Sequence, residues 1–229
     1  ACEAVSAVFR AGITPSALEF IERDAIDWTI KYTDVEIQIL EDVQAHLLVE
    51  VDGNDIDLLY KDCEKIAEVM EQFDCGEILL ADSESQKEQL WKLRRSVGEA
   101  VKANSVYKEE DTVVPRAELA KLLIGVKEIG AKYGFKSVCY GHAGDGNLHV
   151  NIIKGEMSDF DWNNKLTFGI CEIFELTKNL GGTISGEHGI GLVQKEYLGI
   201  VLSDKNIELQ KGIKKLFDPN QILNPGKIF

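Results

Sequence analysis

The sequence is short of positive charge. Only 25 Lys and Arg residues stand against 39 Asp and Glu residues, which gives a formal net charge of −14 at neutral pH. Such a chain repels phosphate backbones and anionic lipid surfaces, so its charge argues against a nucleic-acid or membrane-surface protein. If the ligand is an anion, the basic residues that bind it must be gathered locally.

Cysteine and long apolar runs are scarce as well. The five cysteines are widely scattered and form no Cys-x-x-Cys pair, which favours a reduced, cytoplasmic setting over a disulfide framework. The sequence has no apolar run of membrane-spanning length, and no basic segment followed by an apolar stretch at its start. Its 229 residues, 45% of them hydrophobic, are nevertheless ample for a sizeable core.

Hydrophobic spacing predicts alternating helices and strands. Either a cap at Thr14 with Pro15 in the first turn or a Ser-x-x-Glu capping box at Ser16 predicts a helix through Ile21, which a polar stretch then follows. The other predicted helices cover residues 1–10, 56–73, 84–103, 116–133, 159–180 and 204–217, and the predicted strands cover 45–51, 77–81, 112–115, 136–140 and 147–153. This order predicts an α+β fold in which antiparallel sheets are flanked by helices, with two ferredoxin-like halves sharing a sheet.

The chemistry is concentrated in residues 140–151, Tyr-Gly-His-Ala-Gly-Asp-Gly-Asn-Leu-His-Val-Asn. The strand after the turn alternates with period two, so Asn147, His149 and Asn151 share the face opposite the core. The glycine-rich turn at 143–146 reverses the chain, which brings His142 opposite His149. Two imidazoles that converge in this way indicate a divalent metal site.

A third ligand is available from the glycine-rich segment 181–191, where Glu187 and His188 are the ionisable side chains. Ten of the 20 glycines lie between residues 141 and 191, which suits backbone that passes close to a ligand. The alternative is that the histidines are ordinary strand residues and that Gly181 and Gly182 only end a helix. The combination of motifs favours the metal site.

Two arginines of the predicted helix 84–103 lie beside Trp91. The ordinary interpretation is a solvated helix face on which the aromatic ring covers apolar surface. However, a guanidinium matches a carboxylate through two parallel hydrogen bonds, so Arg94 is a candidate for binding an anionic substrate.

Six motifs in order resemble the C-terminal domain of FAD-linked oxidases of the glycolate oxidase, D-lactate dehydrogenase and D-2-hydroxyglutarate dehydrogenase group. The resemblance covers residues 1–229 and depends on segments 11–19, 90–94, 110–115, 141–151, 185–191 and 218–227. It implies that the chain is the cap and substrate domain of a two-part flavoenzyme. The N-terminal domain that would hold most of the FAD is absent from this sequence, so the chain alone is expected to be inactive.

The resemblance also implies roles for individual residues. A divalent ion, expected to be zinc, would be held by the matching residues His142, His149 and Glu187. The substrate would be faced by Arg94, Lys108, Asn151 and His188, and Asn224 would lie near the flavin. Because His188 is next to the ligand Glu187 and an imidazole can accept a proton near neutral pH, it is the expected general base.

The implied reaction is oxidation of a D-2-hydroxy acid to the 2-oxo acid, with the hydride passing to the flavin and with help from the metal. The expected partners are a small anionic 2-hydroxy acid, the FAD-binding domain, an electron acceptor of unspecified kind and a second copy in a homodimer. Two alternatives stay open. One is a metal-dependent hydrolase built on the same ligands, and the other is a non-catalytic domain that docks a separate flavin subunit.

Overall fold

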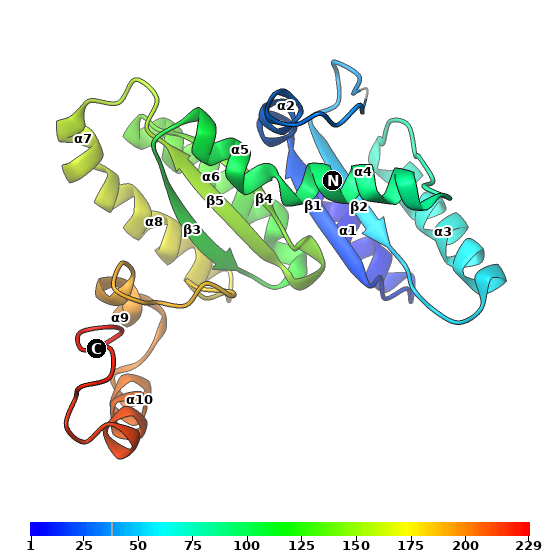
Figure 1. Cartoon of the computed structure of the whole chain (residues 1–229). Coiled ribbons are helices and arrows are strands. Elements are labelled where there is room, and N and C mark those ends of the chain that lie inside the picture. Colours follow the sequence, from blue (N-terminus) through cyan, green and yellow to red (C-terminus); the bar gives the residue numbers. More distant parts are fainter. Residues whose placement is uncertain (38) are drawn as a thin grey trace.

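The computed structural model describes residues 1–37 and 39–229, which build a five-stranded antiparallel sheet with helices on both faces (Figure 1). The strand order is β2-β1-β4-β5-β3, and every neighbouring pair is antiparallel. The strands are β1 (Ala17–Glu22), β2 (Ala45–Glu50), β3 (Tyr107–Val113), β4 (Lys136–Gly141) and β5 (Asn147–Ile153). The predicted α+β class with an antiparallel, helix-flanked sheet is confirmed.

Each face of the sheet has its own core. Leu148, Val150 and Ile152 of β5 point into the larger core, which is covered by α1 (Cys2–Arg10), α3 (Ile56–Met70), α6 (Leu119–Tyr133), α7 (Asp159–Asn164) and α8 (Leu166–Asn179). Ile21 and Tyr140 face the smaller core, which is covered by α2 (Arg23–Tyr32), α4 (Glu84–Arg95) and α5 (Val97–Asn104). The candidate site lies on the face of the smaller core, so the predicted faces of β5 are correct.

The C-terminal part extends beyond the strand ends. Helices α9 (Leu198–Val201) and α10 (Asp204–Phe217) lead away from the sheet, and the tail returns toward α9 (Figure 1). The Ile228 N–H donates to the Gly191 carbonyl at 2.8 Å, which ties the tail to the glycine-rich segment. In the described ranges, no helix is long and apolar enough to cross a membrane.

The predicted helix from Ser16 to Ile21 is wrong, because this segment forms β1. The Ser16 N–H and hydroxyl both donate to the Glu50 carbonyl, at 2.8 and 3.1 Å, instead of capping a helix. Period-two burial then sends Leu18 and Phe20 into one core and Ile21 into the other. A short apolar run fits both periods, and pairing with two neighbouring strands decides between them. The polar stretch that follows contains α2.

Four further predicted elements differ from the structure. Residues 77–81 form no strand and are largely exposed, since no described strand pairs with them. The predicted helices 84–103 and 159–180 are each divided in two, at Ser96 and Lys165. The edge strand closed by proline is confirmed, but it begins at Tyr107 and is therefore longer than predicted.

The side chain of Glu110 projects from β3 into the larger-core side, where it is only 3% exposed. The Gln194 Nε2 amide donates to Glu110 Oε2 at 3.0 Å. Burial raises the pKa of Glu110 to about 7, although the bond from Gln194 and the charge of Lys108 oppose the shift. The Gln194 Oε1 atom is buried without a partner among the described residues, so it can accept the proton of a neutral Glu110.

We expect Glu110→Gln to stabilise the protein above pH 7. Between an ordinary value near 4.5 and about 7, the folded chain keeps a proton that the unfolded chain releases, so Glu110 lowers stability as pH rises through this window. The amide introduced by the substitution can donate to Gln194 Oε1 at every pH, and the gain at pH 8 is bounded at about 3 kcal/mol. Urea unfolding at pH 5 and pH 8 measures it. The exposed Glu99→Gln serves as a control, and an equal pH profile in both variants would contradict the prediction.

Candidate metal and substrate site

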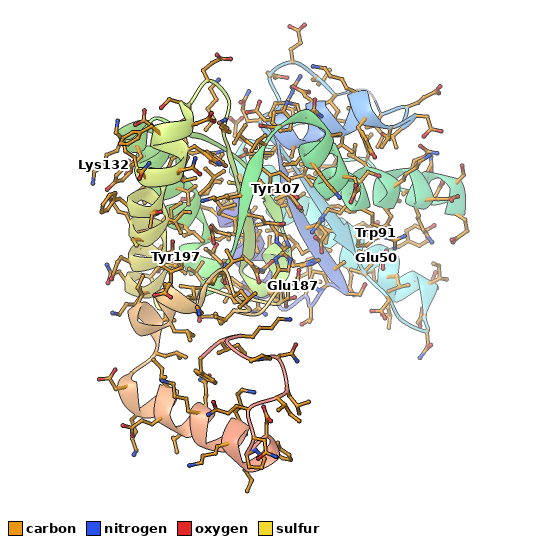
Figure 2. All side chains as sticks on the ribbon, turned by 60° about the vertical axis from the view of Figure 1, so that its left-hand side comes forward. Glu50, Trp91, Tyr107, Lys132, Glu187 and Tyr197 are labelled. Atoms are coloured by element: carbon orange, nitrogen blue, oxygen red, sulfur yellow. The ribbon has the colours of Figure 1, made fainter. Side chains whose placement is uncertain are left out.

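Three predicted ligands converge at the end of the sheet. His149 lies on β5 and His142 directly follows β4. Glu187 lies on the loop beside the strand ends, where Figure 2 labels it. The Glu187 Oε1 atom is 3.3 Å from His149 Nε2 and 3.6 Å from His142 Nε2. Ligands about 2.1 Å from a tetrahedral zinc ion are separated by about 3.4 Å. The spacing and the two-nitrogen, one-carboxylate donor set therefore fit a divalent ion such as zinc.

Each histidine has a carboxylate beside its other ring nitrogen. The Glu19 Oε1 atom hydrogen bonds to His142 Nδ1 at 2.8 Å. The Glu109 Oε1 atom is 3.3 Å from His149 Nδ1, and this buried nitrogen has no hydrogen-bond partner among the described residues. Carboxylates in these positions orient metal-binding imidazoles and fix their tautomers. The Glu19 bond also raises the pKa of His142, partly offset by burial.

Arg94 is turned into the site and is not on a solvated face. Its Nε donates to Glu19 Oε2 at 2.7 Å, and its guanidinium carbon lies 5.0 Å from the centre of the Tyr140 ring. The Arg94 Nη2 atom is buried and has no hydrogen-bond partner in the described part of the chain. The solvated interpretation fits the neighbours instead, because Arg95 covers the Trp91 ring and the Trp91 indole donates to Glu50 at 2.7 Å (Figure 2).

Glu19 was missed by sequence analysis, which assigned it to a helix cap. Its side chain is 5% exposed and has one oxygen on Arg94 and the other on His142. Burial favours the neutral acid, but the bond to His142 and the charge of Arg94 outweigh it, so the pKa of Glu19 lies below its ordinary value. It is therefore a buried carboxylate held between two cationic or proton-donating groups.

The loop that carries Glu187 and His188 is held by Asp111 of β3. Asp111 Oδ2 accepts from the backbone N–H of Glu187 and of His188, both at 2.7 Å, and from the Ser185 hydroxyl at 3.3 Å. Asp111 Oδ1 accepts from the Asn147 amide at 2.6 Å. Burial raises the pKa of Asp111, but these N–H donors outweigh it and leave the pKa below its ordinary value. Sequence analysis assigned Asp111 no role.

Glycine is required where this loop crosses the sheet. A Cβ atom at Gly186 would stand 2.3 Å from the Asn147 amide nitrogen and 3.1 Å from Asp111 Oδ1. At the histidine turn, Gly146 has φ +77° and a Cβ there would meet the Val114 carbonyl. The glycine-rich pattern therefore has two physical causes, namely close approach at Gly186 and left-handed backbone at Gly146.

His188 and Asn151 lie next to the proposed ligands. The His188 ring stacks on His149 with 5.0 Å between the ring centres, and its Nε2 is 3.8 Å from Glu187 Oε1. The His188 side chain is 43% exposed, so it can be reached by a ligand. Asn151 donates to the Val138 carbonyl at 3.2 Å, and its Oδ1 is buried with no partner in residues 1–37 and 39–229.

Two predicted site residues are not brought to this cluster. Lys108 pairs with Ile152 across β3 and β5, so it lies on the opposite face of the sheet, 5.6 Å from the centre of the Trp162 ring. Side chains alternate between the two faces along β3, so the neighbouring residues Tyr107 and Glu109 lie on the site face and Lys108 does not. Asn224 lies in the tail at φ +48° and lines a separate hollow of about 370 Å³ with Lys214 and Phe217.

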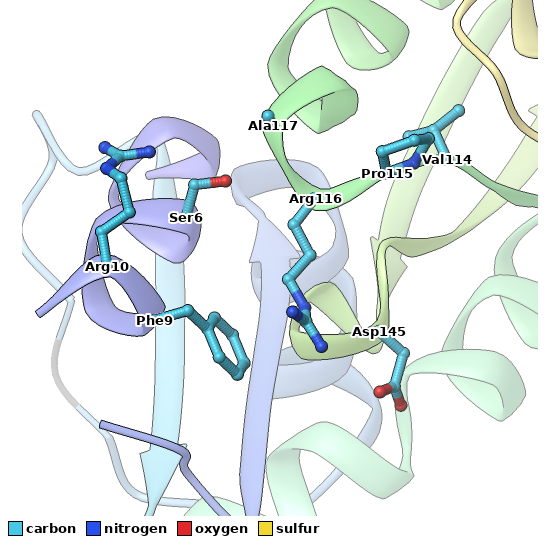
Figure 3. A pocket seen from close by; sticks show the side chains of 8 residues that line it. All are labelled: Ser6, Phe9, Arg10, Val114, Pro115, Arg116, Ala117 and Asp145. Carbon is cyan, nitrogen blue, oxygen red and sulfur yellow. The ribbon is translucent and has the colours of Figure 1, made fainter. Parts of the chain in front are cut away.

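A larger hollow of about 490 Å³ lies between α1 and the start of α6 (Figure 3). Arg10, Phe9 and Arg116 line it, and the Arg116 guanidinium carbon is 3.9 Å from the centre of the Phe9 ring. None of the predicted site residues borders it.

Comparison with known proteins identifies the family. The model of "FAD linked oxidases, C-terminal domain" matches residues 1–228. The chain belongs to this family. It is 34% identical over 225 residues to a D-lactate dehydrogenase of Anaerostipes hadrus, covering 96% of this chain and 47% of that protein. It is 35% identical over 232 residues to glycolate oxidase subunit GlcD of Bacillus subtilis (strain 168), covering 100% and 48%.

The solved structures agree on the fold. A 4-ethylphenol oxidase from Gulosibacter chungangensis, solved with isoeugenol, superimposes with a TM-score of 0.59 at 14% identity over 93% of this chain and 47% of that chain. This likeness shows the architecture of FAD-linked oxidase C-terminal domains and nothing finer. The chain spans about half the length of the relatives that it matches.

Proposed function

We propose that this chain is the substrate-binding, C-terminal part of an FAD-dependent enzyme that oxidises a D-2-hydroxy acid to the 2-oxo acid. The observation that carries the proposal is a buried arginine, with a nitrogen unpartnered among the described residues, beside a His, His and Glu donor set. The names of the relatives, a D-lactate dehydrogenase and a glycolate oxidase subunit, support a substrate of this class.

Arg94 is the proposed anchor of the substrate carboxylate. Its Nε is occupied by Glu19, while Nη2 is buried and lacks an acceptor in the part of the chain that the structure describes. A carboxylate oxygen supplies that acceptor and gains a charge-assisted bond away from water. The guanidinium also places a positive charge beside the substrate in a chain of net charge −14, with part of that charge offset by Glu19.

His142, His149 and Glu187 would hold the divalent ion, and His188 would accept the proton of the substrate hydroxyl. When bound, the ion would supply a Lewis acid that favours loss of this proton, and the flavin would accept the hydride from the α-carbon. His188 is next to the ligand Glu187, and its backbone is fixed by Asp111. The Asn151 Oδ1 atom offers a further buried acceptor that orients a hydroxyl. Lys108 has no part in this proposal, because it faces the other core.

The first test is the zinc content of the purified chain. We expect about one equivalent in the parent and a loss in His149→Ala, because two remaining ligands hold zinc poorly. His46→Ala is the matched control, since His46 lies on β2 at the far edge of the sheet. A parent as empty as His149→Ala, after incubation with zinc, would remove the metal from the proposal.

The second test concerns the substrate class. With the flavin-binding half supplied, at least one of D-lactate, glycolate and D-2-hydroxyglutarate should reduce the flavin, and Arg94→Gln should abolish the effect. No reduction by any of these acids would contradict the proposed oxidation. Metal-dependent ester hydrolysis by the chain alone would favour the hydrolase alternative.

A further inference from the structure

Glu19 contacts both a proposed metal ligand and the proposed substrate anchor. Its Oε1 lies 2.8 Å from His142 Nδ1 and its Oε2 lies 2.7 Å from Arg94 Nε. The side chain projects from β1, which is fixed on both sides by β2 and β4. The carboxylate is therefore held rigidly and each of its oxygens has a separate partner.

The bond to His142 determines which ring nitrogen carries the proton. Because a carboxylate only accepts, it keeps the proton on Nδ1 and leaves the Nε2 lone pair toward Glu187 Oε1, 3.6 Å away. Only an unprotonated nitrogen binds a metal ion. The tautomer that can bind a metal is thus the one that Glu19 selects.

The bond to Arg94 determines where the guanidinium points. The group is planar, so fixing the Nε–H direction also fixes the direction of Nη2, which has no partner among the described residues. The Tyr140 ring, 5.0 Å from the guanidinium carbon, supports the same orientation. Without Glu19, a long and mobile side chain would have to order itself when the substrate binds.

We propose that Glu19 is a positioning residue that sets both the metal-binding tautomer of His142 and the orientation of the substrate anchor Arg94. The inference rests on the proposed function for the roles of these two partners. It goes beyond that function in assigning one buried carboxylate to both halves of the site.

The Glu19→Gln variant tests the proposal, because an amide cannot serve both partners. If its oxygen faces Arg94, its NH₂ group donates to His142 Nδ1 and forces the proton onto Nε2. If its oxygen faces His142, two donors meet at Arg94 and the guanidinium is released. One of the two partners must therefore be lost.

The primary measurement is ¹⁵N NMR of the metal-free chain at a pH where the imidazole is neutral. We expect the His142 Nδ1–H tautomer and a slowly exchanging Arg94 Nε–H in the parent, and loss of one of them in Glu19→Gln. Glu22→Gln is the matched control, because Glu22 is a buried glutamate of the same strand that pairs with Lys127 at 2.8 Å on the other face. Glu22→Gln should leave both signals unchanged. Both signals unchanged in folded Glu19→Gln would overturn the proposal.

Zinc affinity is the second measurement, and it distinguishes the proposed metal site from the proposed positioning role of Glu19. If Glu19→Gln turns its NH₂ toward His142, we expect zinc to bind about 10- to 100-fold more weakly than in the parent. Failure of zinc to bind the parent counts against the metal site and leaves the NMR test of Glu19 intact. If Glu19→Gln does not fold, Arg94→Gln replaces it. A shift of the His142 Nδ1 resonance in Arg94→Gln is then expected, and its absence would show that the two partners do not share Glu19.

Discussion

Replacing His188 with alanine should slow flavin reduction by a D-2-hydroxy acid about 10²- to 10⁴-fold in the flavin-loaded protein, with zinc content unchanged. This range is the usual loss when a general base is removed. Zinc should remain because His188 is not among the three proposed ligands, although its ring stacks on His149. Single-turnover flavin reduction, followed by absorbance, together with metal analysis, measures both quantities.

The matched control is His46→Ala, which removes a histidine from the far edge of the sheet. Normal single-turnover reduction in His188→Ala would refute the role of this residue as base. Loss of zinc in the same variant would place His188 among the ligands, where Glu109, His149 and His188 form a second set of donors within 4.8 Å of one another.

Replacing Asp111 with alanine should release the loop that carries Glu187 and His188. The change removes the Asp111 acceptor from two backbone N–H groups, one hydroxyl and the Asn147 amide, which keeps only the Thr112 carbonyl at 3.2 Å. A buried donor without a partner costs about 1–3 kcal/mol, so we expect a loss of roughly 3 kcal/mol in unfolding free energy and weaker zinc binding. Thermal unfolding and zinc titration measure the two effects.

A paired variant controls for the loss of the carboxylate itself. Asn147→Asp alone places two carboxylates in contact, whereas the double variant Asp111→Asn, Asn147→Asp restores a donor facing an acceptor and keeps the net charge. The double variant should therefore recover part of the stability that Asn147→Asp loses. An Asp111→Ala protein with the stability and zinc affinity of the parent would contradict the role that we give Asp111.

The sequence predicts the parts of this fold that are locally periodic. Strand β5 and the turn before it were recognisable because period-two alternation and Asp-Gly chemistry act within a few residues. Strand β1 was not, because a short apolar run behind a serine satisfies a helix cap equally well, and only pairing with β2 and β4 decides. The predicted strand at residues 77–81 is wrong for the converse reason. These residues have strand propensity but no partner strand, and they are largely exposed.

In the site, too, local patterns could be predicted from the sequence and contacts between distant segments could not. The two histidines could be proposed from composition and spacing, with Glu187 or His188 as the third ligand, and the choice of Glu187 follows from the family resemblance. The structure brings these residues together. Glu19 could not be proposed, because its partners Arg94 and His142 lie 75 and 123 residues away. Lys108 shows how sensitive strand positions are, since a shift of one residue exchanges the two faces of the sheet.

The junction between β1 and β4 gives the site residues a second role, which is to hold the two halves of the sheet together. The two halves of the described sheet are joined there by two residue pairs, Phe20 with Gly141 and Ile21 with Tyr140. The bond between Glu19 and His142 lies at the next position along both strands, so a side-chain hydrogen bond continues the connection where the backbone pairing ends. A substitution at Glu19 or His142 would therefore weaken the junction between the two halves of the sheet and disturb the site at the same time.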